Sequence, residues 1–194
     1  MMVTSFRVLL DACILVPITL CDTLLTLADR RLYVPLWSHE ILDEMERTVT
    51  RLATAQGQGV DDAAKSAAYR RSEMELAFPD AAIHGYEALI SAMTNHEKDR
   101  HVLAAAARTH ADMIVTSNTV DFPLAAAEPY GIKISTPDDF LQDVLRFDER
   151  LVLEAIRDMT AQKRRPPMTE LDMLKRVAKS APDFAAAVLT LLES

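Results

Sequence analysis

The segment VLLDACILVP, residues 8–17, decides the architecture that this sequence predicts. Its apolar residues up to Leu10 predict a short strand that ends at Asp11, the first polar position of the run. Residues 14–28 then predict a mostly apolar helix, which begins either at residue 14 or near Pro17. A strand that is followed at once by a helix is the opening of a strand–helix–strand unit.

The segments that follow continue this alternation. Further strands are predicted at residues 32–36, 113–116 and 132–134, and helices after Ser38, at 61–77, from Asp99 and from Pro137. Ser38 is a suitable N-cap, and Pro137 after Thr136 marks a helix start because proline fits the first helical position. Strands that alternate with helices imply an α/β fold whose parallel sheet has right-handed crossovers.

The last part of the chain has a different character, with no strand signal. Three helices are predicted there, near residues 149–163, 170–179 and 183–192. Thr169 and Asp172 predict a capping box at the start of the second of these helices. We therefore expect a main domain over residues 1–147 and a helical extension over residues 148–194.

The overall charge limits how this protein can meet nucleic acid. The 194 residues carry a formal net charge of −8, and the pI is about 5.1. Such a chain is not expected to hold nucleic acid by charge alone, because phosphate neutralisation needs clustered Lys and Arg. A nuclease is not excluded, since a carboxylate-rich site becomes locally positive once a divalent metal fills it.

Cysteine use and hydropathy predict a soluble, cytoplasmic protein with no membrane partner. Cys13 and Cys21 form no CxxC pair, and both are expected to be buried thiols in a reducing compartment. The apolar run from residue 8 to residue 21 is interrupted by Asp11 and Pro17. No charge-free stretch therefore reaches membrane-spanning length.

Polar side chains gather at one predicted edge of the sheet. Asp11 follows the first strand, Asp99 opens a helix, and Asn118 and Asp121 lie in the loop after the strand at 113–116. Ligands of an open parallel sheet bind outside the carboxyl ends of its strands. We therefore expect these four side chains to lie close together.

The helix after Ser38 brings a further carboxylate to this edge. Its apolar stripe consists of Leu42, Met45, Val49 and Leu52. Glu44 and Glu46 both flank this stripe, and helical geometry alone does not choose between them.

Gathered carboxylates point to a metal site, although a simpler interpretation exists. Their mutual repulsion is offset by a hard divalent cation, Mg²⁺ or Mn²⁺, held by oxygen ligands. Zinc is disfavoured because the five histidines are dispersed and no Cys/His cluster occurs. The alternative is that some of the 29 Asp and Glu residues occupy helix starts by dipole preference alone. The acidic pattern fits both interpretations.

Four segments resemble the acidic motifs of the PIN-domain family, and they occur in the family's order. They are VLLDACILVP at 8–17, WSHEILDEMERTV at 37–49, DRHVLAAA at 99–106 and IVTSNTVDFP at 114–123. Three more resemble a bacterial, VapC-like subgroup: FPDA at 78–81, GYEAL at 85–89 and PDDFL at 137–141. That subgroup tends to carry a helical C-terminal extension like residues 148–194.

This resemblance implies a fold, an activity and partners. The fold is a three-layer α/β/α arrangement around a central parallel sheet of four or five strands. The activity is hydrolysis of RNA phosphodiester bonds by an endoribonuclease that depends on Mg²⁺ or Mn²⁺. Members of the subgroup resemble toxins that a cognate antitoxin silences. RNA, an antitoxin and a second copy of the chain are therefore the expected partners.

The resemblance also assigns roles to residues. It maps the family's glutamate onto Glu44. The sequence departs from the family at Asn118, where many PIN nucleases have an aspartate. Asp121 is then the candidate for the missing carboxylate. The expected catalytic residues are Asp11, Glu44, Asp99 and Asp121; the expected metal ligands are Asp11, Asp99 and Asp121; the expected surrounding layer is Asn118 and Thr116.

Two other functions stay open. The first is a PIN fold without catalysis that acts as a binding module, for which Asn118 is the best support in the sequence. The second is a PIN-type nuclease that acts on structured DNA.

Several basic residues and a histidine allow two interpretations each. Arg70, Arg71 and the run from Lys163 to Arg165 fit a solvated helix face and a polar linker better than a nucleic-acid contact. Arg100 and His101 adjoin Asp99 and fit either a phosphate contact or a solvated helix start.

Overall fold

The computed structural model describes residues 6–162 and 168–193, and its centre is a five-stranded parallel sheet with the order β3-β2-β1-β4-β5. The strands are β1 (Arg7–Leu10), β2 (Val34–Ser38), β3 (Ala82–Ile83), β4 (Met113–Val115) and β5 (Lys133–Ser135). The basic residues Lys163 to Arg165 and the last residue of the helix predicted at 149–163 lie outside the described residues.

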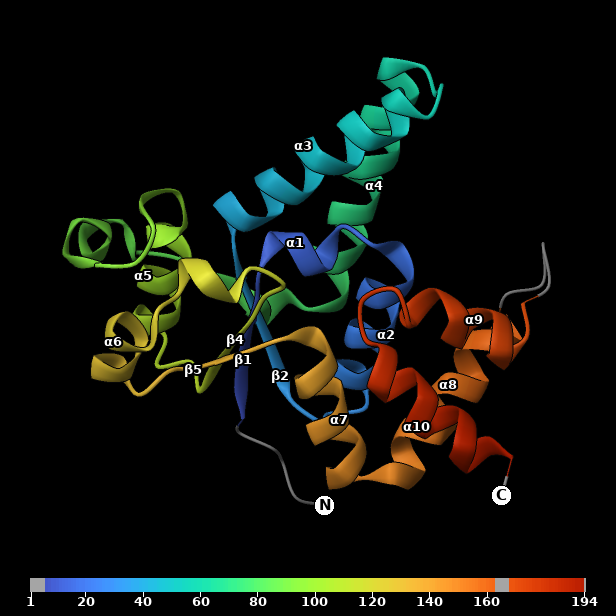
Figure 1. Cartoon of the computed structure of the whole chain (residues 1–194). Coiled ribbons are helices and arrows are strands. Elements are labelled where there is room, and N and C mark those ends of the chain that lie inside the picture. Colours follow the sequence, from blue (N-terminus) through green and yellow to red (C-terminus); the bar gives the residue numbers. More distant parts are fainter. Residues whose placement is uncertain (1–5, 163–167, 194) are drawn as a thin grey trace.

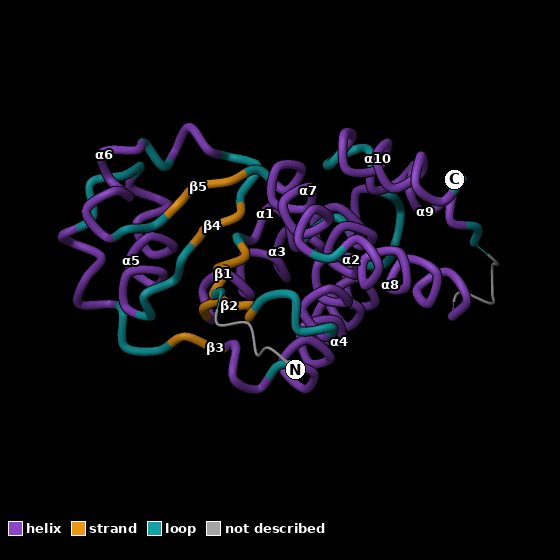
Figure 2. Tube along the Cα trace, turned by 90° about the horizontal axis from the view of Figure 1, so that it is seen from below, coloured by secondary structure: helices purple, strands orange, loops and turns teal. Residues whose placement is uncertain are grey.

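Helices cover both faces of this sheet. They are α1 (Ala12–Leu15), α2 (Ile18–Asp29), α3 (His39–Ala55), α4 (Val60–Ala77), α5 (Arg100–Arg108), α6 (Leu124–Ala127), α7 (Pro137–Phe147), α8 (Glu149–Gln162), α9 (Glu170–Val177) and α10 (Pro182–Leu192). Figure 2 shows α5 and α6 on one side of the strands and α2 and α7 on the other. The predicted three-layer α/β/α class with a parallel sheet is confirmed.

The strand at the centre of the sheet is fully enclosed. Val8, Leu9 and Leu10 of β1 have no exposed surface, because β2 and β4 flank β1 and helices cover both faces. Strands covered on both faces read as continuous apolar runs, which is why this segment is apolar without alternation.

Two predicted elements are displaced for local reasons. The helix predicted at 14–28 is split, with α1 ending before Pro17 and α2 starting at Ile18, because proline lacks the N–H that would continue α1. The strand predicted at 32–36 is β2 at 34–38. Leu32 is instead part of the C-terminal turn of α2, donating its N–H to Leu27 O at 3.2 Å after Arg31 in a left-handed conformation (φ 61°).

One strand was not predicted individually. β3 is only two residues long and pairs in parallel with Trp37 and Ser38 at the end of β2. Two residues are too few to show an alternating pattern, so this fifth strand depends on tertiary pairing.

The interpretation of Arg70 and Arg71 as a solvated helix face is wrong. Arg70 donates hydrogen bonds to the carbonyl oxygens of Leu15 and Val16, at 3.0 Å for Val16, and so satisfies the open C-terminus of α1. Arg71 forms ion pairs with carboxylates of α3 and α4, Glu46 at 3.2 Å among them. Both arginines therefore fix the α3–α4 pair to the body of the protein.

The C-terminal helices pack directly on the main domain, beside α2 and α7 (Figure 1). Asp138 of α7 accepts hydrogen bonds from the N–H groups of Asp183 and Phe184, at 3.1 and 2.8 Å, and so caps α10 from another helix. The predicted capping box of Thr169 and Asp172 is confirmed. The boundary between residues 147 and 148 falls between α7 and α8 and stays a prediction. No helix among the described residues is long and apolar enough to cross a membrane.

Candidate active site

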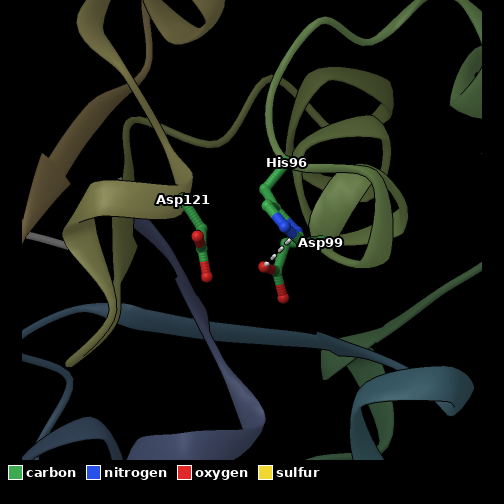
Figure 3. Close-up of side chains that lie close together, drawn as sticks. All are labelled: His96, Asp99 and Asp121. Atoms are coloured by element: carbon green, nitrogen blue, oxygen red, sulfur yellow. Dashed lines mark ion pairs between the residues drawn. The ribbon is translucent and has the colours of Figure 1, made fainter.

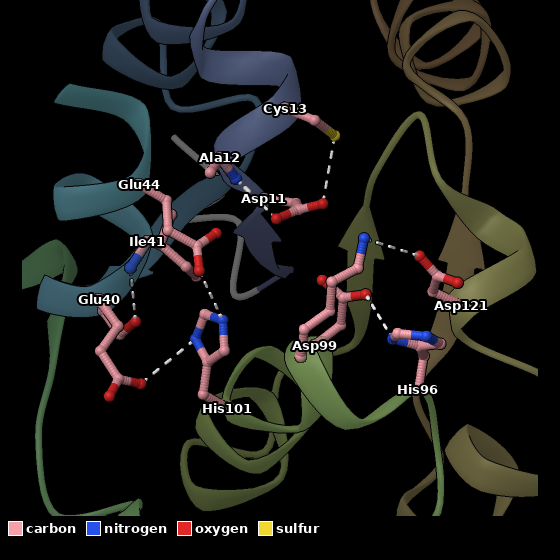
Figure 4. Close-up of polar contacts among 12 residues, drawn as sticks. Asp11, Ala12, Cys13, Glu40, Ile41, Glu44, His96, Asp99, His101 and Asp121 are labelled. Carbon is pink, nitrogen blue, oxygen red and sulfur yellow. Dashed lines mark hydrogen bonds and ion pairs between the residues drawn. The ribbon is translucent and has the colours of Figure 1, made fainter. Parts of the chain in front are cut away.

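Asp11 is placed at the carboxyl end of β1 by the strands on both sides. Its N–H donates to Val115 O at 3.1 Å, which continues the β1–β4 pairing by one residue. One carboxylate oxygen accepts from the N–H of Ala12 at 2.7 Å, and the other accepts from the Thr116 hydroxyl at 2.7 Å and the Cys13 thiol at 3.2 Å. The side chain is therefore buried and held in one orientation (Figure 4).

Cys13 corrects the expectation that both thiols belong to the core. Cys21 is buried, whereas Cys13 is half-buried and lines the same cavity as Asp11. Burial first, and then the charge of Asp11, raise the pKa of the Cys13 thiol to about 11, so it is a neutral hydrogen-bond donor at physiological pH.

The third helix brings Glu44 to the site and turns Glu46 away from it. The Ser38 hydroxyl caps α3 by accepting from Ile41 N at 3.2 Å, as predicted. Glu44, in the second turn, lines the cavity that contains Asp11, while Glu46 pairs with Arg71. The structure therefore separates the two carboxylates that helical geometry alone could not.

His101 lies behind Glu44, not on a solvated helix start. Its Nε2 atom is 3.2 Å from a carboxylate oxygen of Glu44, and its Nδ1 atom is 3.3 Å from one of Glu40. Tyr86 donates its hydroxyl to the same oxygen of Glu40 at 3.2 Å. The His101 side chain is only 11% exposed, so it links two glutamates of α3 rather than reaching toward solvent (Figure 4).

Asp99 and Asp121 form a second acidic group together with a histidine. Asp99 occupies the N-cap position of α5, and Asp121 ends the short 3-10 turn after β4. Together with His96, a residue that the sequence did not indicate, they offer ligand atoms that all lie within 4.8 Å of one another (Figure 3). His96 is half exposed and belongs to a polar segment with no periodicity, which left no signal to find it by.

Asn118 and Thr116 connect the two halves of the site. Asn118 donates its side-chain amide to Asp121 and its backbone N–H to the Thr116 hydroxyl at 2.9 Å. Thr116 in turn donates to Asp11. The two residues expected to form a surrounding layer thus hydrogen-bond to two of the expected ligands.

One cavity brings the predicted residues together. Its volume is about 400 Å³, and Asp11, Glu44, Asp99 and Asn118 all line it. Asp121 adjoins it through Asn118 and through Lys98, whose Nζ atom is 3.8 Å from the Asp121 carboxylate. Residues that are 88 positions apart in the chain, counting from Asp11 to Asp99, therefore face a common space.

Comparison with known proteins finds two family models that match separate segments of the chain. A family model described as PIN domain matches residues 7–120, which is more than half of the chain. This chain belongs to the PIN-domain family. A second model, described as VapC50 C-terminal domain, matches residues 137–190, so the expected VapC-like subgroup with a helical extension is confirmed as well.

A curated relative of this PIN domain comes from Mycobacterium tuberculosis (strain ATCC 25618 / H37Rv). It is named "Putative ribonuclease VapC50" and is 46% identical over 110 residues. The match covers 57% of this chain and 65% of the relative, which is less than two thirds of the relative's length. No solved structure matches the chain.

The electrostatics of the PIN site show the strain of gathering like charges. Burial, then a hydrogen bond with Asp121 and the charge of Asp11, raise the pKa of Asp99 to about 6. Burial alone would lower the pKa of His101, but contact with Glu44 and the charges of Glu40 and Asp11 outweigh it, and the net shift is upward. The pKa of Asp99 is therefore raised mainly by burial and further by neighbouring carboxylates, while the pKa of His101 is raised by carboxylates against the effect of burial.

The residues present fit a divalent cation. One carboxylate oxygen of Asp99 is buried and accepts no hydrogen bond from any residue in the described part of the chain. A buried anionic oxygen without a donor is costly, and a metal ion relieves that cost. Among the described residues, the group with ligand atoms within 4.8 Å of one another consists of Asp99, Asp121 and His96; Asp11 is outside this group, although it lines the same cavity as Asp99. Two carboxylates and one imidazole suit a divalent ion such as Mg²⁺ or Mn²⁺.

The raised pKa values of Asp99 and His101 predict that the metal-free protein is more stable at about pH 6 than at about pH 8. Asp99, with a folded pKa above its unfolded value, destabilises the fold while ionised, and this cost is relieved as the pH falls through about 6. His101, whose pKa is also raised, stabilises the fold while protonated and loses this contribution as the pH rises. Urea unfolding at several pH values measures the trend. A free energy of unfolding that falls from pH 8 to pH 6 would contradict it.

Proposed function

We propose that this protein is a metal-dependent endoribonuclease that hydrolyses RNA phosphodiester bonds. The observation that carries the proposal is the convergence of Asp11, Glu44 and Asp99, from three separate elements, on one cavity of about 400 Å³. The name of the mycobacterial relative supports ribonuclease activity, and membership of the PIN family supports the use of a divalent metal.

Asp11 and Asp99 would hold the cation, with Asp121 as a third carboxylate. When bound, Mg²⁺ or Mn²⁺ lowers the pKa of a water molecule and offsets negative charge on the phosphodiester. Thr116 and the N–H of Ala12 fix the Asp11 carboxylate, and the Asn118 amide fixes Asp121.

Glu44 would orient the attacking water. Its contact with His101 limits its rotation, so its other carboxylate oxygen would be free to accept a hydrogen bond from a water in the cavity. The water oxygen would attack phosphorus as the bond from phosphorus to the leaving oxygen breaks, and the proton of the water would pass to Glu44 and then to the leaving oxygen. Positioning of this kind supplies much of the rate enhancement in phosphoryl transfer.

The wider role is proposed from similarity. A VapC-type C-terminal match and a relative named VapC50 support a toxin of a type II toxin–antitoxin pair, which acts in the cytoplasm and is silenced by an antitoxin protein. We also propose that the chain forms a homodimer.

The test uses the purified chain with single-stranded RNA, and with single-stranded and hairpin DNA, each with Mg²⁺, with Mn²⁺ and with EDTA. We expect RNA to be cut only when a divalent metal is present. Cleavage of DNA in place of RNA would favour the structured-DNA nuclease. No cleavage of either substrate, together with no saturable binding of Mn²⁺, would favour the inactive binding module.

A further inference from the structure

A groove runs along α3 directly beside the candidate active site. The helices α3 and α4 project together as a hairpin from the body of the protein (Figure 1). A groove of about 610 Å³ follows one face of α3 from Asp43 to Thr54 and ends at Val60, the first residue of α4. Arg47 lines both this groove and the cavity that holds Asp11 and Glu44. The groove therefore begins where the acidic cavity ends.

Arg47 and Arg51 line this groove, in a row of α3 residues that begins at Glu44 in the cavity. Glu44, Arg47 and Arg51 are spaced three and four residues apart on α3, so they share one face of the helix. A separation of four residues corresponds to about 6 Å along the helix axis. The row thus leads away from the cavity along the groove.

The positive charge of this row is available to a ligand. Arg47 and Arg51 are exposed, and neither forms an ion pair with any carboxylate among residues 6–162 and 168–193. The acidic side chains that also line the groove, Asp43 and Glu46, are both paired with Arg71. The groove therefore offers two exposed arginines without a carboxylate partner in the described part of the chain, while its two carboxylates share Arg71 with Glu75.

We propose that this groove binds the sugar-phosphate backbone of a single RNA strand, with Arg47 and Arg51 each contacting a phosphate. Guanidinium groups match phosphate geometry and stay charged at any physiological pH. Contact through two groups in a single row fits one strand, and an open groove lets the strand continue into the cavity. This inference rests on the proposed function, because it takes RNA as the substrate that the cavity cuts.

The test compares the full chain with the double variant Arg47→Gln/Arg51→Gln. Each phosphate contact to a single strand contributes a slope of about −0.7 to log K against log [salt], so the loss of two contacts should flatten the slope by about 1.4. We expect binding of a fluorescently labelled single-stranded RNA, measured by anisotropy over a KCl series in EDTA, to weaken on the order of tenfold at low salt. With metal present, KM for RNA cleavage should rise by a similar factor while kcat changes little.

The matched control is Arg157→Gln/Arg176→Gln, which removes two exposed arginines from α8 and α9. It should leave affinity and salt slope unchanged. Equal affinity and slope in the groove variant and the unmodified chain, or an equal loss in the control, would overturn the proposal. The binding measurement requires no cleavage. Binding that depends on Arg47 and Arg51 without metal-dependent cleavage would support the groove and contradict the proposed function.

Discussion

Asp11→Asn is expected to reduce metal-dependent RNA cleavage by more than about a hundredfold, beyond the 10–100-fold typical of residues that only support a ligand. The carboxylate is buried and is the one ligand candidate fixed by three hydrogen bonds, from Ala12 N, Thr116 and Cys13. Asparagine keeps an oxygen for the N–H of Ala12, and it remains a good N-cap for α1. The fold should therefore persist while the charge that attracts the cation is lost.

Cleavage rates with saturating Mn²⁺ and RNA, beside a thermal melt of each protein, measure this effect. Asp183→Asn is the matched control, because it removes one exposed carboxylate in the first turn of α10, which packs on α7 and α9. Undiminished cleavage by the Asp11 variant would remove Asp11 from the reaction and, with it, the proposed mechanism.

Asp99→Asn should make the metal-free protein more stable and abolish its stabilisation by metal. Near neutral pH the unmodified protein keeps Asp99 ionised although its pKa is raised to about 6 from an ordinary value of 3.8. That difference of about two pKa units corresponds to at most about 3 kcal/mol. The side chain is still 14% exposed, and solvent reduces this cost. We therefore expect the free energy of unfolding of the variant to be higher by about 1–2 kcal/mol, and its Tm to be higher by roughly 2–8 °C.

Melting curves with and without Mn²⁺ separate the two effects. Metal that binds only the folded state should raise the Tm of the unmodified protein with the logarithm of the metal concentration once this exceeds Kd, and should leave the Tm of the variant unchanged. A variant that is less stable than the unmodified protein, or that Mn²⁺ still stabilises equally, would show that Asp99 does not carry the cost assigned to it.

Much of this arrangement was predictable because local signals and sheet topology agree. The apolar run to Leu10 predicted β1, and Ser38 predicted the start of α3. The rule that ligands bind at the carboxyl ends of parallel strands predicted that Asp11, Asp99 and Asn118 meet. The structure places all three on one cavity. Their roles in catalysis stay a prediction.

The rest depended on contacts that no local pattern encodes. Glu44 and Glu46 are equivalent by helical spacing, and only the position of Arg71, 25 residues beyond Glu46, distinguishes them. His96 and His101 carry no periodic signal, yet one lies beside Asp99 and the other behind Glu44. Arg70 and Arg71 resemble a solvated pair in sequence because the carbonyls and carboxylates they bind come from α1 and α3.

The Asn118 position illustrates how a departure from a family motif can be absorbed. An amide there cannot supply a charge, but its side-chain N–H group donates to Asp121, three residues further along. Its backbone N–H also donates to Thr116, which holds Asp11. The residue is therefore placed to orient a neighbouring carboxylate, which is the role expected for it beside Asp121.

The central claim is that carboxylates from distant parts of the chain bind one divalent ion. Crystals of the protein soaked in Mn²⁺ test it most directly, through the anomalous scattering of manganese. A peak within bonding distance of Asp11 and Asp99 carboxylate oxygens is the predicted result. A well-ordered cavity with no peak there, or a peak held by other residues, would contradict the account.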